Sequence, residues 1–289
     1  MTFTRVLRVA LVLGCGVFAA QGFAAGQTAT AGNAAKIERL YVFGDSYSDQ
    51  GEGYLDADGP TAVVYFAQKL GLRIAPSNTE DPKYRSLNFA VSGAQTGSGL
   101  GNKTQGVLIG YGMKNQVQDF VDQVHSSGID FTPKTTLFFI AGGLNDGRLA
   151  DGVSVANEED EIRSLYKVGA RRFAVALLPE KIPGFGKQGV RLNAALAKIP
   201  DDLKGELKDA DIYVSHWGLF FDEVLTNPGK YGLTNTTDAC AGRAIRNEST
   251  TPCATPGTYF YYHAEHPSTA THKAVGEMLY AEALEKAAK

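Results

Sequence analysis

Apolar and polar positions follow one another along the chain in short blocks that predict strands and helices in turn. The predicted strands are apolar runs, most of them continuous as in strands buried on both faces of a parallel sheet: residues 38–43, 86–90, 135–141, 172–178 and 211–215. Predicted helices separate and follow them, at residues 60–70, 117–124, 158–168, 190–197, 219–225 and 269–287. The repeated βα order predicts an α/β fold, a three-layer α/β/α sandwich around a parallel five-stranded sheet.

The first 35 residues differ from this pattern. Arg5 and Arg8 precede an apolar stretch at residues 9–20, and small residues follow it, which is typical of a secretory signal peptide over residues 1–25. Residues 26–35 are predicted to be a flexible leader, and residues 36–289 a single catalytic domain. Export to the periplasm or the medium follows from this interpretation. Cys15 leaves a lipid-anchored form as the alternative, although the apolar run continues past it to an acceptable cleavage site.

Composition narrows the class of protein. The 289 residues are 44% hydrophobic and carry a net charge of -3, so the chain can bury a large core but lacks the basic field that binds nucleic acid. Cys240 and Cys253 lie in a segment rich in Gly, Thr and Pro with no helical or strand period. In an exported protein such a pair predicts a disulfide, with a reduced, unpaired pair as the alternative.

Polar residues follow the predicted strands at the edge where the carboxyl ends of a parallel sheet form a reactive crevice. Ser46 comes directly after the first strand, Gly93 closes the loop after the second, and Asn145 follows the third. His266 precedes the last predicted helix, on a loop held by that helix. A hydroxyl, an imidazole and amide groups meeting at one edge predict nucleophilic catalysis by a serine.

These blocks together resemble the GDSL, or SGNH, hydrolase superfamily. They are Gly44-Asp45-Ser46, Gly93, Gly143-x-Asn145-Asp146 and His266-Pro267, in the family's order across nearly the whole domain. The resemblance implies the flavodoxin-like SGNH hydrolase fold and a carboxylic ester hydrolase without a cofactor or metal. It also implies that Ser46 is the nucleophile, that His266 is the base, and that the Ser46 amide, the Gly93 amide and the Asn145 side chain form the oxyanion hole.

The sequence departs from the family pattern at one position. The family has Asp-x-x-His, whereas this chain has His263-Ala264-Glu265-His266, so a histidine stands where the acid orients the catalytic base. Three alternatives follow: the main-chain carbonyl of His263 accepts the imidazole N–H, Glu265 substitutes, or the enzyme is weak. We favour the carbonyl, because Glu265 directly precedes His266 and in an extended segment would point to the opposite side.

Two further interpretations of the same residues are weaker. His263 and His266 could bind a metal with Glu265 or His272, but no His-Glu-x-x-His helix or second cluster supports this, and His263 could equally be a ring packed among aromatic neighbours. The glycines of residues 97–101 do not match a nucleotide-binding register, which favours an ordinary loop.

The substrate is less constrained than the chemistry. Residues 227–235 and the two cysteines resemble the bacterial secreted lipase/esterase branch called lecithinase/haemolysin-like. No long apolar lid follows, which favours a short-chain, water-soluble acyl ester over a membrane surface. A phospholipase or lipase, a carbohydrate acetylesterase, and a non-catalytic module that binds an acylated sugar or lipid remain alternatives. The sequence leaves the oligomeric state open.

Overall fold

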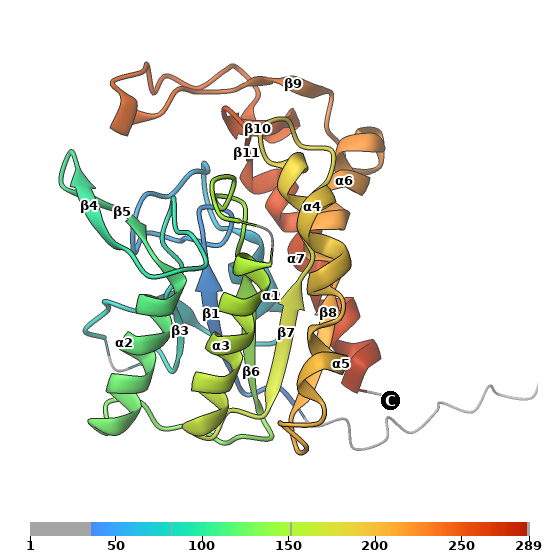
Figure 1. Cartoon of the computed structure of the whole chain (residues 1–289). Helices are drawn as coiled ribbons and strands as arrows, with labels where there is room; N and C mark the ends of the chain where they lie inside the picture. The colour runs from blue at the N-terminus through green and yellow to red at the C-terminus, as the bar shows by residue number, and fades with distance from the viewer. Residues whose placement is uncertain (1–35, 82, 151, 288–289) are drawn as a thin grey trace, which may run out of the picture. The chain divides into compact units, whose positions relative to one another are not determined.

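The computed structural model describes residues 36–81, 83–150 and 152–287. The signal peptide, the leader and Cys15 predicted from the sequence lie outside these residues. The described chain forms a central sheet with helices on both faces (Figure 1). The three-layer α/β/α prediction is therefore confirmed.

The central sheet has six parallel strands rather than the predicted five. In sheet order they are β2 (Ile74–Pro76), β3 (Ser86–Asn88), β1 (Arg39–Gly44), β6 (Thr136–Ala141), β7 (Arg172–Ala176) and β8 (Asp211–Ser215). The strand that the sequence did not predict is β2, which is only three residues long and ends in a proline. Such a run carries too few alternating positions to be recognised, although it pairs with β3 in register from Ile74 opposite Ser86.

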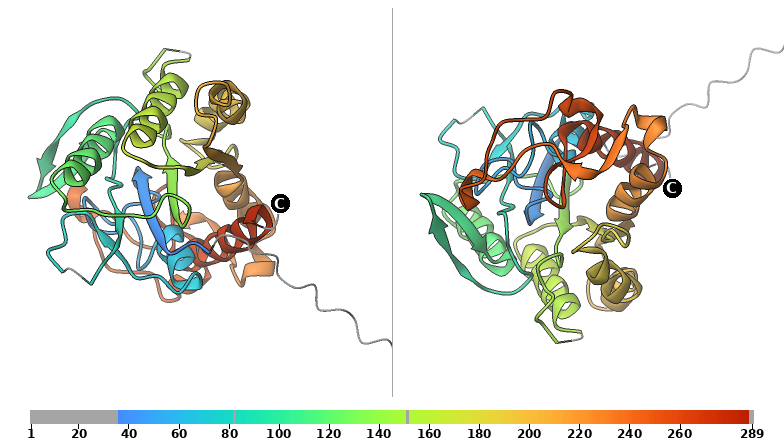
Figure 2. Two further views of the ribbon diagram at one scale, coloured as in Figure 1. Left: turned by 90° about the horizontal axis from the view of Figure 1, so that it is seen from below. Right: turned by 90° about the horizontal axis from the view of Figure 1, so that it is seen from above.

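Helices cover the two faces of this sheet. Their bounds are α1 (Ala62–Lys69), α2 (Met113–His125), α3 (Val153–Lys167), α4 (Gly186–Leu196), α5 (Ile199–Leu203), α6 (Trp217–Thr226) and α7 (Thr269–Ala287). Seen along the strands, α2, α3 and α4 lie on one side of the sheet and α1, α6 and α7 on the other (Figure 2). The first and last helices touch closely, because Gly276 of α7 faces α1 and a Cβ there would lie 2.5 Å from the Cβ of Tyr65.

The core is aromatic around the first strand. Tyr41 and Phe43 of β1 are almost fully buried, and Phe43 stacks on Phe89 with ring centroids 5.3 Å apart. Phe120 of α2 packs edge-on against both strand residues. Rings of this size bury much apolar surface in fixed geometry, so the end of β1 is held rigidly.

Two smaller sheets lie beyond the carboxyl ends of the central strands. One is a hairpin of β4 (Leu100–Thr104) and β5 (Val107–Tyr111), and the other joins β9 (Asn235–Ala239), β10 (Tyr259–His263) and β11 (His266–Pro267). In the view from above, the segment from β9 to β11 crosses over the end of β1 (Figure 2). The strand order reverses between β1 and its neighbours β3 and β6, and that reversal leaves a crevice at this edge.

Candidate active site

The loop after β1 presents Ser46 at the crevice. The backbone of Gly44 is clamped by the side-chain amide of Gln116, which donates to the Gly44 carbonyl over 2.9 Å and accepts from its N–H over 3.0 Å. A turn follows at once, since the Asp45 carboxylate accepts the N–H of Tyr47 at 3.2 Å. Ser46 is thereby held at the tip of a short, bonded turn with 4% of its surface exposed.

The imidazole of His266 meets the hydroxyl of Ser46. The Nε2 atom of His266 lies 2.9 Å from Ser46 Oγ, although the two residues are 220 positions apart in the chain. The Nδ1 atom of the same ring lies 2.9 Å from the backbone carbonyl oxygen of Ala264. With Nδ1–H donating to that oxygen, Nε2 carries the lone pair and can take a proton from the serine.

The carbonyl that orients His266 belongs to Ala264 and not to His263, which corrects our expectation by one residue. His263 and His266 are opposed partners in the antiparallel pair of β10 and β11, and residues 264 and 265 form the turn between them. Glu265 has a φ of 64°, in the left-handed region. The turn bends the chain back sharply, so the carbonyl of its first residue faces the ring.

The two ring nitrogens of His266 have Ala264 and Ser46 as their hydrogen-bond partners, and the Glu265 carboxylate lies elsewhere. Its carboxylate packs against Gly184, and its backbone carbonyl accepts the hydroxyl of Tyr47 at 2.5 Å. A carboxylate turned toward Gly184 is in no position to orient the His266 imidazole. The alternative in which Glu265 replaces the family aspartate is therefore not supported by the hydrogen bonds of His266.

The other two predicted site residues lie at the same crevice. Gly93 has a φ of 78°, and a Cβ there would lie 3.0 Å from Cγ2 of Ile109. Any other residue would be strained and crowded at this position. Asn145 follows β6, and its side-chain Nδ2 donates to the Ala94 carbonyl over 2.9 Å, which fixes the orientation of the amide and leaves its second N–H for another acceptor.

A buried carboxylate that the sequence did not indicate stands beside the pair. Asp56 is 2% exposed and lies on the loop between β1 and α1. It does not directly follow a strand, so the strand pattern in the sequence does not indicate it as a site residue. Its Oδ2 accepts the Ser92 hydroxyl at 2.8 Å and the Arg243 Nη2 at 2.7 Å, and its Oδ1 lies 3.3 Å from His263 Nδ1. The His263 ring is thus turned toward Asp56, whereas Nδ1 of His266 has Ala264 as its partner.

Two further carboxylates, Asp49 and Asp146, hold the loops around Ser46 through hydrogen bonds. Asp49 accepts the N–H groups of Gly51, Gly53 and Ser92, the last at 2.7 Å. Asp146 accepts both the N–H and the hydroxyl of Thr96. These side chains tie the first, second and third blocks of the sequence together.

Burial sets the protonation of the site. It lowers the pKa of His266 below its ordinary value, against the opposing charge of Asp56. It raises the pKa of Asp45 to about 7 and that of Asp49 to about 6. Burial also acts to raise the pKa of Asp56, but the hydrogen bond from His263 and the charges of His266 and Arg243 outweigh it and lower that pKa below its usual range.

Ser46 and His266 open into a pocket of about 530 Å³. It is lined by Ser46, Ser92, Gly93, Thr104, Ile109, Asn145, Phe185, Arg243, Ile245, Arg246, Ala264, Glu265 and His266. The residues come from strand-end loops, from the β4–β5 hairpin and from the short 3₁₀ helix η2 (Ala244–Arg246). The space is large enough for a small ester.

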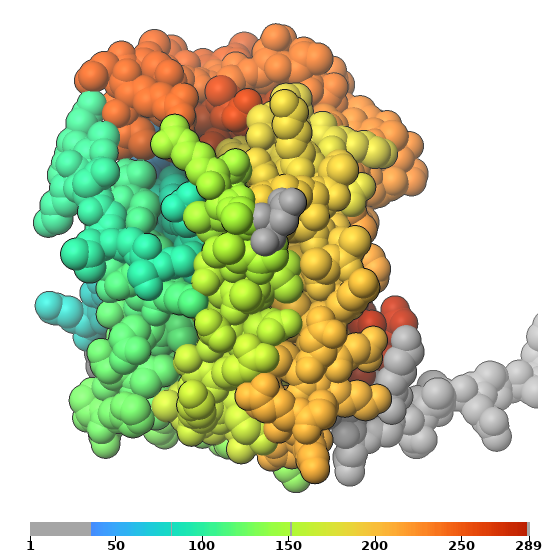
Figure 3. All heavy atoms as spheres, viewed as in Figure 1, coloured from blue at the N-terminus to red at the C-terminus, as the bar shows by residue number. Residues whose placement is uncertain are grey.

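Two outer segments meet above this pocket. The turn of the β4–β5 hairpin carries Gln105, whose Nε2 donates to Oδ1 of Asn247 over 2.8 Å. Asn247 lies in a loop closed by the disulfide between Cys240 and Cys253. Figure 3 shows this orange segment covering the end of the molecule beside the teal hairpin. The disulfide that the sequence predicted therefore fastens one wall of the pocket.

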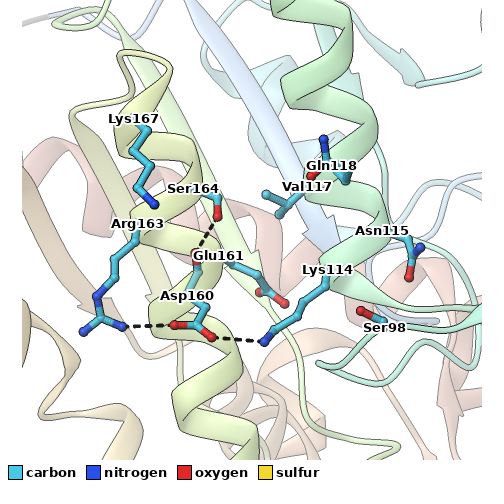
Figure 4. A pocket seen from close by; sticks show the side chains of 10 residues that line it. All are labelled: Ser98, Lys114, Asn115, Val117, Gln118, Asp160, Glu161, Arg163, Ser164 and Lys167. Carbon is cyan, nitrogen blue, oxygen red and sulfur yellow. Dashed lines mark hydrogen bonds and ion pairs between the residues drawn. The ribbon is translucent and has the colours of Figure 1, made fainter.

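A second hollow of about 460 Å³ lies between α2 and α3 (Figure 4). Lys114, Asp160 and Arg163 line it, with Nζ of Lys114 3.1 Å from an Asp160 oxygen. Glu161 points toward the same space and is almost fully buried, and burial raises its pKa well above the usual range. Two serines, Ser98 and Ser164, line this hollow without a histidine, in contrast to the pocket around Ser46 and His266.

The remaining histidine of the metal interpretation is engaged elsewhere. His272 is fully buried, and its Nδ1 accepts the N–H of Ala62 at 3.2 Å. Within residues 36–81, 83–150 and 152–287, no three His, Cys, Asp or Glu side chains are grouped as metal ligands. In the same part of the chain, no helix has both the length and the apolar character needed to span a membrane.

The fold and the serine–histidine pair define the class of SGNH hydrolases, and comparison with known proteins agrees. A model of the GDSL-like lipase/acylhydrolase family matches residues 40–279. The chain belongs to this family.

Relatives and solved structures are similar to the chain at low identity. A GDSL esterase/lipase of Arabidopsis thaliana is 26% identical over 60% of this chain and 50% of its own length, and another is 26% identical over 80% and 78%. The chain thus spans only half of the first relative. A solved structure of an Axe2 variant, an acetylxylan esterase of Geobacillus stearothermophilus, has a TM-score of 0.47, with 14% identity over 85% of this chain and 93% of that one.

Proposed function

We propose that this protein is an exported serine esterase that hydrolyses short acyl esters through an acyl-enzyme on Ser46. The observation that carries the proposal is the 2.9 Å contact between Ser46 Oγ and His266 Nε2, at the wall of a pocket that also contains Gly93 and Asn145. A nucleophile and a base at this distance, with the base oriented from its other nitrogen, are the parts that acyl transfer needs.

In the first half of the reaction Ser46 attacks the ester. The bond from Oγ to the carbonyl carbon forms while the carbonyl π electrons move to its oxygen and the hydroxyl proton passes to His266 Nε2. The bond from carbon to the alcohol oxygen then breaks, and the proton on Nε2 goes to that leaving oxygen. Water repeats the sequence on the acyl-enzyme and releases the acid.

The oxyanion that forms in each half would accept hydrogen bonds from three donors. They are the backbone N–H groups of Ser46 and Gly93 and the free N–H of the Asn145 side chain. Two observations support this role: the amide of Asn145 is held by Ala94, and Gly93, with a φ of 78°, has no side chain that could block approach to its N–H.

The preference for short acyl chains rests on the shape of the pocket. Its volume is about 530 Å³, and the hairpin and the disulfide-closed loop join above it through Gln105 and Asn247. A long acyl chain would have to separate these two segments. The disulfide supports export, because such bonds persist in oxidising compartments. The lecithinase/haemolysin-like branch indicated by residues 227–235 stays a prediction.

A panel of p-nitrophenyl esters from acetate to palmitate tests the proposal. The wild-type protein should cleave acetate and butyrate best, and Ser46→Ala and His266→Ala should each lower turnover by at least about 10⁴-fold. His125→Ala, at an exposed position on α2, is the matched control and should behave as wild type. A preference for palmitate would instead indicate a lipase, and wild-type turnover no greater than that of Ser46→Ala would indicate a non-catalytic binding module.

A further inference from the structure

Asp56 is a buried carboxylate beside Ser46 and His266 that is paired with a buried guanidinium. Its Oδ1 lies 2.7 Å from Nε of Arg243, its Oδ2 lies 2.7 Å from Nη2 of the same guanidinium, and Ser92 donates to Oδ2. The side chains of Asp56 and Arg243 are 1% and 8% exposed. A carboxylate so enclosed stays ionised and keeps one orientation.

The same carboxylate faces the catalytic base. Oδ2 of Asp56 lies 3.7 Å from Nε2 of His266, the nitrogen that also contacts Ser46 Oγ. At this distance Asp56 is too far to accept a hydrogen bond from Nε2, so it does not compete with Ser46 for that atom. Its charge is close enough to act on the ring, since opposite charges about 4 Å apart in a protein attract strongly.

His263 occupies the position of the family aspartate, and its Nδ1 lies 3.3 Å from Oδ1 of Asp56. The acid beside His266 in this chain therefore belongs to a different loop, the one that carries Asp56. The family aspartate has two effects on its histidine, because it fixes the tautomer and also supplies a negative charge. In this chain the tautomer is fixed by the neutral carbonyl of Ala264, which carries no charge.

We propose that Asp56 is a positioning residue that supplies the negative charge missing from position 263 and stabilises the protonated form of His266 from its Nε2 side. The proposal rests on the serine esterase function given above. The two effects of one aspartate are thereby divided between Ala264, which orients the ring, and Asp56, which balances the charge that arrives with the proton of Ser46. Arg243, Ser92 and His263 hold the carboxylate in place.

The isosteric variant Asp56→Asn tests this role. The kcat for p-nitrophenyl acetate should fall on the order of 10²-fold, with KM within about threefold, because only the charged state of His266 loses stabilisation. The acid limb of kcat/KM should also move to lower pH, since loss of a nearby negative charge makes protonation of His266 harder. Asp58→Asn is the control: it removes an exposed charge two positions away, and the amide oxygen can still accept the N–H of Thr269.

The buried guanidinium left behind by Asp56→Asn needs its own variant. In the double variant Asp56→Asn/Arg243→Met neither charge remains, and kcat should stay at least about tenfold below wild type. Recovery to the wild-type kcat would show that the loss came only from an unpaired Arg243 and would overturn the proposal. The proposal would also be overturned if the single variant Asp56→Asn had the kcat and the acid limb of the wild-type protein.

A second measurement is independent of turnover. In a Ser46→Ala background, the ¹⁵N chemical shifts of the His266 ring report its titration directly. Asp56→Asn should shift that titration to lower pH, and an unchanged titration would contradict the proposal. Absence of any ester hydrolysis by the wild-type protein would reject the esterase function, while the NMR titration would still decide whether Asp56 acts on His266.

Discussion

The hydroxyl of Tyr47 donates a hydrogen bond to the backbone carbonyl oxygen of Glu265 over 2.5 Å. Tyr47 directly follows the proposed nucleophile, and Glu265 directly precedes the proposed base. The bond therefore joins the two catalytic segments next to the reacting atoms. The ring of Tyr47 also packs on His266, with ring centroids 5.6 Å apart.

Tyr47→Phe removes this bond and keeps the ring. A hydrogen bond of this kind contributes about 1 kcal/mol, so kcat should fall about fivefold as Glu265 loses the contact that holds its left-handed conformation. Steady-state kinetics with p-nitrophenyl acetate would measure the change. Tyr65→Phe, which loses only a contact between Tyr65 and Thr269, is the control, and equal kcat values in the two variants would exclude the proposed coupling.

Asn145→Ala should lower kcat by about 10²–10³-fold with little change in KM, because its amide is needed when charge develops on the substrate oxygen. Kinetics beside thermal unfolding would separate this loss from a loss of fold. Asn78→Ala is the matched control, since Asn78 is exposed and does not line the pocket. A rise in KM without a fall in kcat would argue against an oxyanion role.

The pH dependence of kcat/KM should show an acid limb with its midpoint below pH 6.5. His266 can accept the proton of Ser46 only when neutral, and burial lowers its pKa below 6.5. Activity is thus retained in mildly acidic solution and falls as pH drops through the pKa of His266. Rates of a neutral ester between pH 4 and 8 would measure the limb, and a midpoint above 6.5 would contradict the burial argument.

His272 should make the fold sensitive to acid. Burial lowers its pKa to about 3, so the unfolded chain takes up a proton below about pH 6.5 while the folded chain does not. Stability is therefore lost as pH falls from 6.5 toward 3, by about 2 kcal/mol at pH 5.

His272→Asn removes this titration and keeps an acceptor for the Ala62 N–H. Its free energy of unfolding minus that of wild type should therefore increase by about 2 kcal/mol when the pH is lowered from 8 to 5, because only the wild type loses stability through this ring. Urea denaturation at the two pH values would measure the difference. His125→Asn, at an exposed position, should leave it unchanged, and a pH-independent difference in His272→Asn would show that the buried ring does not titrate this way.

Cys240→Ser/Cys253→Ser should lower the free energy of unfolding by about 3 kcal/mol, because the unfolded chain regains the freedom of the closed loop. The KM for short esters should rise as well, since Arg243 and Ile245 in that loop line the pocket. Urea denaturation and kinetics with and without reductant would test both. Reductant should shift the wild-type protein toward the double variant and leave the variant unaffected.

The sequence predicts the parts of this fold that local patterns encode. The sequence predicts the apolar runs of β1, β6, β7 and β8, and it places Ser46 and Asn145 after the first two of them. It also predicts α7, whose predicted bounds are those observed. The sequence does not predict the beginning of α3, which starts at Val153 rather than at residue 158. Glu158 and Glu161 of this helix are buried, although acidic residues in a helix usually indicate its exposed face.

Contacts between distant segments could not be predicted in this way. Asp56 lies in a polar stretch, and its partners Arg243 and His263 are 187 and 207 residues further along the chain. The small sheet of β9, β10 and β11 is equally hidden, because its strands are short and partly exposed. Which carbonyl lies beside His266 depends on the turn at Glu265, whose φ is positive. A glycine at this position would have predicted such a turn from the sequence, whereas a glutamate does not.

The close contact between α1 and α7 at Gly276 has a consequence for when the enzyme becomes active. Ser46 follows β1, the first strand, whereas His266 comes directly before α7, the last helix. That helix packs against α1, the first helix. A nascent or proteolytically shortened polypeptide that ends before α7 would still carry His266, but it would lack the helix that follows the His266 loop and packs against α1. The contact between Ser46 and His266 thus joins the first strand of the described chain to its last segment, and it needs the complete domain.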